Sequence, residues 1–170
     1  MTVLAIIREK TLKAKQKAIL LSQLLLDKKI SVNDLVKFAE TANDVDKATC
    51  VEALELTTKK DSGIANKKTF QFVTKALTAT GPRVKWESAR VIANTVPLFS
   101  NELGDTIKNL LDNTEHKGMV VRWSAALALG EIVKLRTKQN KDLLPAIEAI
   151  LRREEENSIR KIYLAAIKSA

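Results

Sequence analysis

Two tryptophans and several basic side chains recur at one position of a repeated segment. Trp86 and Trp123 stand at equivalent positions of two copies, and each comes two residues after a valine that begins an apolar helical pattern. Arg90 and Leu127 follow them by one helical turn. Tryptophan and arginine are enriched at binding hot spots, and an indole ring also stacks on bases or lies over a cation. The pattern therefore indicates a binding surface.

Lysines occupy the same position in the neighbouring copies of the segment. If Val45 begins a fainter copy of the segment that begins at Val84, then Lys47 precedes Trp86 in the row and Lys161 follows Trp123. The spacing leaves open whether the two tryptophans are exposed or pack between repeats. We predict a partner-binding row on adjacent helices that consists of Lys47, Trp86, Arg90, Trp123, Leu127 and Lys161.

A second basic set follows the first apolar residue of each clear copy, and its members are Lys85, Arg122 and Arg160. These residues fall at the edge of the face that the apolar pattern directs towards the core. Their stems either cover apolar surface while their charged groups pair locally, or the charged groups contact phosphate. They are the candidate phosphate contacts of this chain.

The residues needed for most enzymatic chemistry are scarce. The chain has one histidine, His116, and one cysteine, Cys50. It has no Gly-x-Gly-x-x-Gly motif, no phosphate-binding loop, no Gly-x-Ser-x-Gly motif and no carboxylate pair suited to acid–base catalysis. We therefore expect no catalytic residue, no metal site and no cofactor. Cys50 lies in the apolar pattern and is interpreted as a small core residue.

A repeat of helices must position these side chains. The segment from Val121 to Gly130 has copies that begin at Val84 and Ile159, and a near-constant period of this length is typical of stacked helical repeats. Glycine (5 residues) and proline (3) are scarce, which favours helices. We predict an all-α solenoid in one domain, residues 1–170, with about five antiparallel helix pairs. The pairs fall near residues 2–29, 31–60, 67–97, 101–136 and 141–169.

In each pair we expect an outer helix followed by an inner one, with the inner helices side by side. Ser31 can cap the second outer helix with its hydroxyl. Gly130 disfavours a helix, so we expect close packing against a neighbouring helix there. Residues 2–29 form either one long helix or two, because no strong break divides them.

The segment Val-Arg-x-x-Ala-Ala-x-Ala-Leu-Gly at 121–130, with weaker versions at 84–93 and 159–168, resembles the HEAT-repeat family, which is armadillo-like. The resemblance implies a right-handed superhelix whose inner helices line a concave groove and whose members mostly serve as scaffolds. A weaker likeness links the tryptophans and the positive charge to the AlkD-like HEAT DNA glycosylases. That branch places a catalytic Asp on the concave face, whereas the predicted row has none and its nearest acid is Glu87.

The net charge of +9 is spread along the chain without a basic tail. Such charge favours anionic partners only weakly. We predict a non-enzymatic scaffold module that binds a protein partner through its concave inner face. The alternative is nucleic-acid binding through the same basic, tryptophan-containing groove.

The ends of the sequence bear on where the protein is located and on whether it associates with itself. The N-terminal apolar run from Val3 to Ile7 is too short for a signal peptide, and no stretch is long enough to span a bilayer, so we expect a cytoplasmic protein without a membrane partner. The last inner helix is apolar enough to allow self-association through the terminal pair. Its apolar residues are Ile159, Ile162, Tyr163, Leu164 and Ile167.

Overall fold

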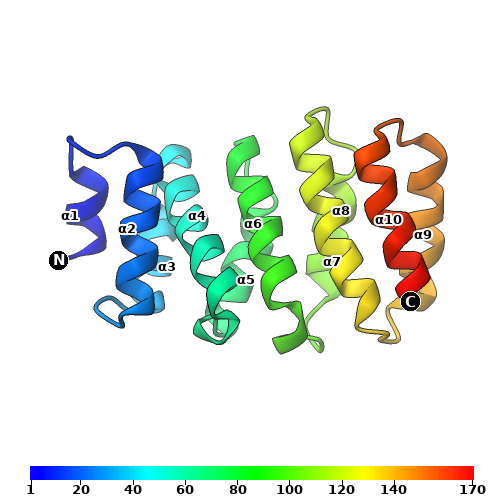
Figure 1. The fold of residues 1–170 in the computed structure, drawn as a ribbon, viewed down its shortest axis with the longest axis horizontal. Helices are drawn as coiled ribbons and strands as arrows, with labels where there is room; N and C mark the ends of the chain where they lie inside the picture. Colours follow the sequence, from blue (N-terminus) through cyan, green and yellow to red (C-terminus); the bar gives the residue numbers. More distant parts are fainter.

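The computed structural model describes residues 1–170 as ten α-helices in two layers (Figure 1). The inner layer contains α2 (Ala14–Leu26), α4 (Asp44–Lys60), α6 (Pro82–Thr95), α8 (Met119–Lys134) and α10 (Asn157–Ser169). The outer layer contains α1 (Val3–Arg8), α3 (Val32–Thr41), α5 (Lys67–Ala76), α7 (Gly104–Asn113) and α9 (Asn140–Arg153). Short 3₁₀ helices, η1 (Ser62–Ile64) and η2 (Val96–Leu98), follow α4 and α6.

Consecutive inner helices lie side by side from α2 to α10, and each outer helix packs against the inner helix that follows it. In Figure 1, α3, α5 and α7 lie behind the inner helices, whereas α1 and α9 lie at the two ends of the stack. Clefts separate α3 from α5 and α5 from α7, so the outer helices are spread further apart than the inner ones. Because the inner helices are closer together than the outer ones, the stack of helix pairs curves towards its inner face. The predicted all-α solenoid of antiparallel helix pairs is confirmed.

The first pair consists of two helices rather than one. The Thr2 hydroxyl caps α1 by accepting a hydrogen bond of 3.1 Å from the Ala5 amide. The chain then leaves the helix, and the Glu9 carboxylate accepts a hydrogen bond of 3.0 Å from the Thr11 amide. A side chain that binds a nearby backbone amide offers the chain an alternative to the helix. Ser31 caps α3 as predicted, with a hydrogen bond of 3.0 Å from the Asp34 amide.

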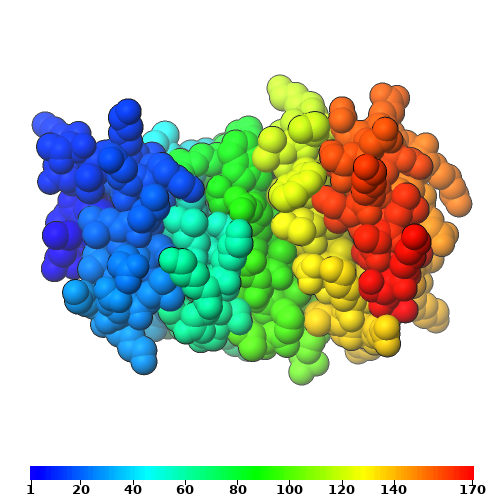
Figure 2. All heavy atoms as spheres, in the orientation of Figure 1, coloured from blue at the N-terminus to red at the C-terminus, as the bar shows by residue number.

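One cluster of buried apolar residues runs from Val3 in α1 to Ala166 in α10. The space-filling view shows the successive segments as one continuous body (Figure 2). Small residues allow the inner helices to approach closely: a Cβ atom added at Gly130 would lie 3.4 Å from the Ala166 Cβ on α10. The single domain over residues 1–170 stays our proposal, and the unbroken core supports it.

The structure corrects the register of the weakest copy. Asn43 precedes α4 as Gly81 precedes α6, so Asp46, and not Val45, stands at the position of Val84. Burial agrees with this alignment, because Val45 is 70% exposed whereas Val84 is 1% exposed. Every residue of the fainter copy therefore shifts by one position.

With this register, the fourth residue of every inner helix is basic: Lys17, Lys47, Lys85, Arg122 and Arg160. Four of the five side chains donate hydrogen bonds to carbonyl groups at the end of the preceding outer helix or in the turn after it. Lys17 binds the Ile7 carbonyl and Lys85 binds that of Leu77 at 3.0 Å. These carbonyls have no partner within the helix, and a cation there also interacts favourably with the helix dipole.

The two arginines of this row make the larger networks. Arg122 binds the His116 and Lys117 carbonyls, each at 3.1 Å, and the Glu154 carboxylate at 3.0 Å. Arg160 binds the carbonyls of Leu151 and Glu154. Although burial raises the pKa of Glu154, hydrogen bonds from Arg122 and from the Glu156 amide hold that pKa below its ordinary value.

Gly130→Val tests the close packing of α8 against α10. The added methyl groups would overlap Ala166 and Ile162. We expect the free energy of unfolding to fall by about 1–3 kcal/mol, the usual effect of overpacking. Urea unfolding followed by circular dichroism measures it. Gly104→Val is the control, because nothing lies within 4 Å of a Cβ at Gly104. Equal effects of the two substitutions would contradict the packing argument.

Arg122→Ala tests the row of cations. It leaves the buried Glu154 carboxylate without its charged partner, so we expect a loss of about 2–4 kcal/mol of stability at neutral pH. Because Arg122 lowers the pKa of Glu154 in the folded state, its contribution is lost as the pH falls through that pKa. The deficit of the variant should therefore shrink in acid. Arg152→Ala, at an exposed position in α9, serves as control.

Candidate functional site on the inner face

Trp86 and Trp123 lie at the fifth position of α6 and α8, on neighbouring helices of the inner layer. Both indole side chains are only partly exposed, as expected if they pack between repeats. Trp123 packs against the hydrophobic core. Trp86 donates a hydrogen bond of 3.2 Å from Nε1 to the Glu87 carboxylate. The structure thus brings the two predicted tryptophans into adjacent positions and leaves part of each available for contact.

Arg90 and Leu127 lie one turn further along the same two helices, and both are partly exposed. Lys161 occupies the equivalent position to the tryptophans in α10 and is exposed. The structure therefore keeps five of the six predicted row residues at two matching levels of α6, α8 and α10. Whether they bind a partner remains a prediction.

Lys47 does not belong to this row. In the corrected register it matches Lys85, and Ala48 takes the place of Trp86 in α4. Lys47 lines the cleft between the outer helices α3 and α5 instead. The prediction was wrong because α4 starts with Asp44-Val45, and Val45 imitates the buried valine that begins the other copies.

Lys85, Arg122 and Arg160 hold outer-helix carbonyls, as described above. Lys85 also donates to the Asn113 side chain at 3.0 Å, and burial lowers its pKa. Of the two interpretations given to these residues, the structure therefore shows local pairing. Whether they also contact phosphate stays a prediction.

Three glutamates on the inner face are buried, and of these only Glu87 was identified from the sequence, as the acid nearest the predicted row. Glu52 and Glu55 come from α4, and Glu87 comes from α6. The sequence spacing shows no carboxylate pair because the residues meet only across two helices. Their one visible signal is an acidic residue within an otherwise apolar stretch of a predicted inner helix. Such residues are rarely buried without a partner.

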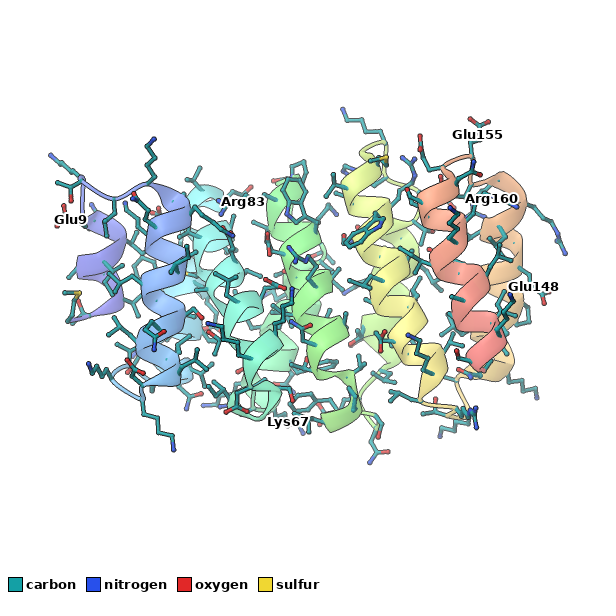
Figure 3. All side chains as sticks on the ribbon, in the orientation of Figure 1. Glu9, Lys67, Arg83, Glu148, Glu155 and Arg160 are labelled. Atoms are coloured by element: carbon teal, nitrogen blue, oxygen red, sulfur yellow. The ribbon has the colours of Figure 1, made fainter.

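Basic residues from two inner helices pair with these glutamates. Lys15 of α2 binds Glu52 at 2.6 Å, and Arg83 of α6 binds the other oxygen of Glu52. Arg83 lies near the start of α6, beside α4 (Figure 3). Arg90 binds Glu55 at 3.1 Å and lies 3.8 Å from Glu87. The side chains thus form a charged network that joins α2, α4 and α6 on the inner face.

Glu87 has a carboxylate oxygen that is both buried and without a partner. Its Oε2 atom is buried without a hydrogen-bond partner, while Oε1 accepts from Trp86. Burial raises the pKa of Glu87, Arg90 and Trp86 oppose that effect, and the nearby charges of Glu52 and Glu55 add to it. A buried polar atom without a partner is costly, and this oxygen is closed to solvent, so it is an energetic cost of the fold.

Other potentially reactive side chains have structural roles. Cys50 is fully buried, and burial raises the pKa of its thiol to about 12, so the unreactive thiol form dominates at neutral pH. His116 accepts a hydrogen bond of 2.9 Å from the Gly118 amide through Nδ1. No group of three or more His, Cys, Asp or Glu side chains is arranged to hold a metal ion. No helix has the length and apolar character needed to cross a membrane.

The last inner helix uses most of its apolar side chains within the chain. Ile159 and Tyr163 are buried, and Ile162 and Ile167 pack against the core. Leu164 is the exception, with 46% of its surface exposed. The apolar surface that suggested self-association through the terminal pair is therefore small.

No protein-family model matches the chain, and no curated protein matches its sequence. Solved structures do match its fold. A designed armadillo repeat protein in complex with the peptide (KR)4 superposes with a TM-score of 0.74, at 18% identity, over 98% of this chain and 73% of that chain. An engineered protein gives a TM-score of 0.76, at 18% identity, over 98% of this chain and 78% of that chain.

A natural protein with the same architecture is found in the complex of CpcE and CpcF of phycocyanin lyase from Nostoc sp. PCC7120. It superposes with a TM-score of 0.69, at 17% identity, over 97% of both chains. These similarities define the class: an armadillo- and HEAT-like helical-repeat solenoid. The resemblance to HEAT repeats is thereby confirmed at the level of the fold. Structural matches at sequence identities this low show a shared fold and do not show a shared function.

Glu87→Gln tests whether the buried carboxylate serves the fold. A carboxyl whose folded-state pKa is raised stabilises the protein below its unfolded-state pKa, and this stabilisation is lost as the pH rises through the folded-state pKa. We therefore expect the variant to be more stable than the natural chain at neutral pH, with a gap that narrows in acid. Urea unfolding at several pH values measures it, and Glu155→Gln is the exposed control. A variant that is less stable at neutral pH would contradict this.

Proposed function

We propose that this protein is a non-enzymatic scaffold module that binds a protein partner on the face formed by its inner helices. The observation that carries the proposal is the pair Trp86 and Trp123, which are partly exposed at the same level of two adjacent inner helices. Leaving part of an indole in water has no structural advantage. Tryptophan contributes a large contact area to an interface for little loss of side-chain entropy.

The charged network beside Trp86 supports an extended partner segment that carries a basic side chain. A cation placed there could lie against the partly exposed indole ring of Trp86, with the Glu87 carboxylate beneath it contributing a nearby negative charge. The solved designed armadillo protein that shares this fold holds a peptide of alternating basic residues. That similarity supports the mode of binding, whereas the argument for the cation depends on Glu87 and Trp86.

The alternative, nucleic-acid binding, loses its main support in the structure. The three candidate phosphate contacts all bind carbonyls within the chain, and Lys47 of the predicted row lines a cleft between outer helices. Arg90 is paired with Glu55. Lys161 of the predicted row remains exposed and without an ion pair. The charged network of α2, α4 and α6 contains three carboxylates and three cations, so it adds no net positive charge to the inner face.

Trp86→Ala tests the proposal in an affinity capture from a native cell extract treated with nuclease. We expect the variant to bind the captured protein about 30-fold more weakly or worse, the loss typical of a hot-spot tryptophan. Glu87→Gln should also weaken capture although it stabilises the fold. Arg152→Ala serves as the binding control because its side chain is exposed in the outer helix α9.

Two results would contradict the proposal. One is loss of the far-UV helical signal in Trp86→Ala, which would make the indole a core residue. The other is capture that disappears on nuclease treatment in the natural chain, together with binding of oligonucleotides that falls steeply with added salt. That second result would establish the nucleic-acid alternative.

A further inference from the structure

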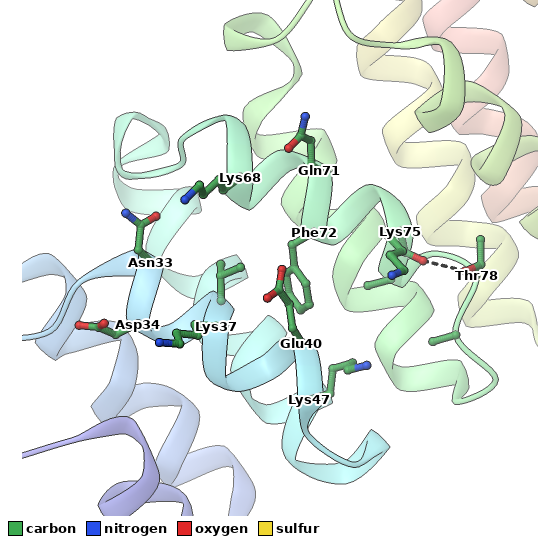
Figure 4. Close-up of a pocket in the computed structure, with 13 residues that line it drawn as sticks. Asn33, Asp34, Lys37, Glu40, Lys47, Lys68, Gln71, Phe72, Lys75 and Thr78 are labelled. Carbon is green, nitrogen blue, oxygen red and sulfur yellow. Dashed lines mark hydrogen bonds between the residues drawn. The ribbon is translucent and has the colours of Figure 1, made fainter.

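A second concave surface lies on the outer side of the molecule, in the cleft between α3 and α5. Its volume is about 860 Å³, which is within the range of small-molecule sites. Figure 4 shows Lys37 and Glu40 from α3 opposite Lys68 and Phe72 from α5. The cleft lies on the opposite layer from Trp86 and Trp123, so the proposed protein-binding function does not involve it.

Four lysines line this cleft, and none of them has an ion pair within the chain. They come from three elements: Lys37 from α3, Lys47 from the start of α4, and Lys68 and Lys75 from α5. The carboxylates that line the same cleft are those of Asp34 and Glu40. Like charges gathered around a concave surface repel one another, and their combined potential attracts an anion. The local excess is two positive charges.

The next cleft along the outer layer provides an internal comparison. It lies between α5 and α7, has a volume of about 730 Å³, and occupies the equivalent position one repeat later. Its lining lysines, Lys75 and Lys108, are balanced by Glu102 and Asp105, and Glu102 also pairs with Lys67 at 3.5 Å. The neighbouring cleft therefore has no positive excess, although the chain as a whole is basic.

Lys47 supplies the second observation. It occupies the position at which the other four inner helices bind carbonyls of the preceding outer helix, yet its ammonium group has no hydrogen-bond partner in the chain. Only Ala42 and Asn43 separate α3 from α4. This position of the repeat is a lysine in α4, but the lysine does not bind a carbonyl of the preceding outer helix as its equivalents do. The side chain lines the cleft instead, where it is half-buried.

The floor of the cleft is apolar. It consists of Phe72, which is 7% exposed, with Val36, Ala76 and Ala79 around it. Lysine ammonium groups at the rim suit phosphate oxygens, and an apolar floor suits a flat ring. A peptide in extended conformation would need a continuous groove across several helices, whereas this cleft is bounded by two helices. The dimensions therefore favour a small molecule over an acidic segment of a protein.

We propose that the cleft between α3 and α5 binds a nucleotide-sized organic phosphate, with Lys37, Lys47 and Lys68 as the phosphate-binding side chains. The carboxylate of Glu40 lies among these lysines and weakens the attraction. This arrangement predicts opposite effects for two neighbouring substitutions. Removing the charge of Lys47 should weaken binding, and removing the charge of Glu40 should strengthen it.

Isothermal titration of the full chain with ATP in the absence of divalent cations tests the proposal, with inorganic phosphate and inorganic triphosphate as further probes. We expect Lys47→Gln to weaken ATP binding by about two- to fivefold and Glu40→Gln to strengthen it by a similar factor, as is usual for single exposed charges. Lys108→Gln in the neighbouring cleft is the matched control and should leave the affinity unchanged. ATP should bind more tightly than inorganic triphosphate if its ring contacts the floor.

Several outcomes would overturn the proposal. They are absence of ATP binding at low ionic strength, equal losses in Lys47→Gln and Lys108→Gln, and weaker binding in Glu40→Gln. A short acidic peptide that binds at α3 and α5 more tightly than ATP would assign the cleft to a protein partner instead. These side chains lie at the surface, so circular dichroism should confirm that each variant folds. Loss of ATP binding would leave the inner-face proposal intact, because Trp86→Ala tests that separately.

Discussion

The two-layer arrangement depends on how each outer helix ends against the inner helix that follows it. The last carbonyls of an α-helix have no partner within the helix, and the negative end of the helix dipole lies there. In this chain a basic residue at the fourth position of each inner helix faces that problem, and four of the five donate hydrogen bonds to such carbonyls. The contact fixes the relative height of the two helices in a pair, and repeating it keeps successive pairs in register.

The inner face follows from that register. When neighbouring inner helices start at the same height, equivalent positions form rows, so Trp86 lies beside Trp123 and Arg90 beside Leu127. Close approach of these helices requires small residues at their contacts, of which Gly130 is the extreme case. Large side chains are excluded from these contacts, and Trp86, Arg90 and Trp123 keep part of their surface exposed. The candidate site is therefore a consequence of the same packing that holds the solenoid together.

The sequence predicted the helices, the pairing and most of the row, because Val84, Val121 and Ile159 begin strong copies whose apolar pattern is unambiguous. It misplaced Lys47, because α4 lacks a buried residue at the matching position and Val45, one residue earlier, resembles it. It could not reveal the cluster of Glu52, Glu55 and Glu87, since that depends on distances between two helices and not on spacing along one. The same limit applies to the cleft between α3 and α5, which exists only because the outer helices are spread apart.

Part of the positive charge of this chain is used in contacts within the protein. Of the residues that produce the net charge of +9, the row at the helix ends neutralises carbonyl dipoles, and Lys15, Arg83 and Arg90 neutralise buried glutamates. A basic composition thus partly reflects how many internal positions require a cation. The remaining basic side chains are spread over the surface of the protein. Lys47 is informative because the other residues at its repeat position bind carbonyls of the preceding outer helix, whereas Lys47 does not.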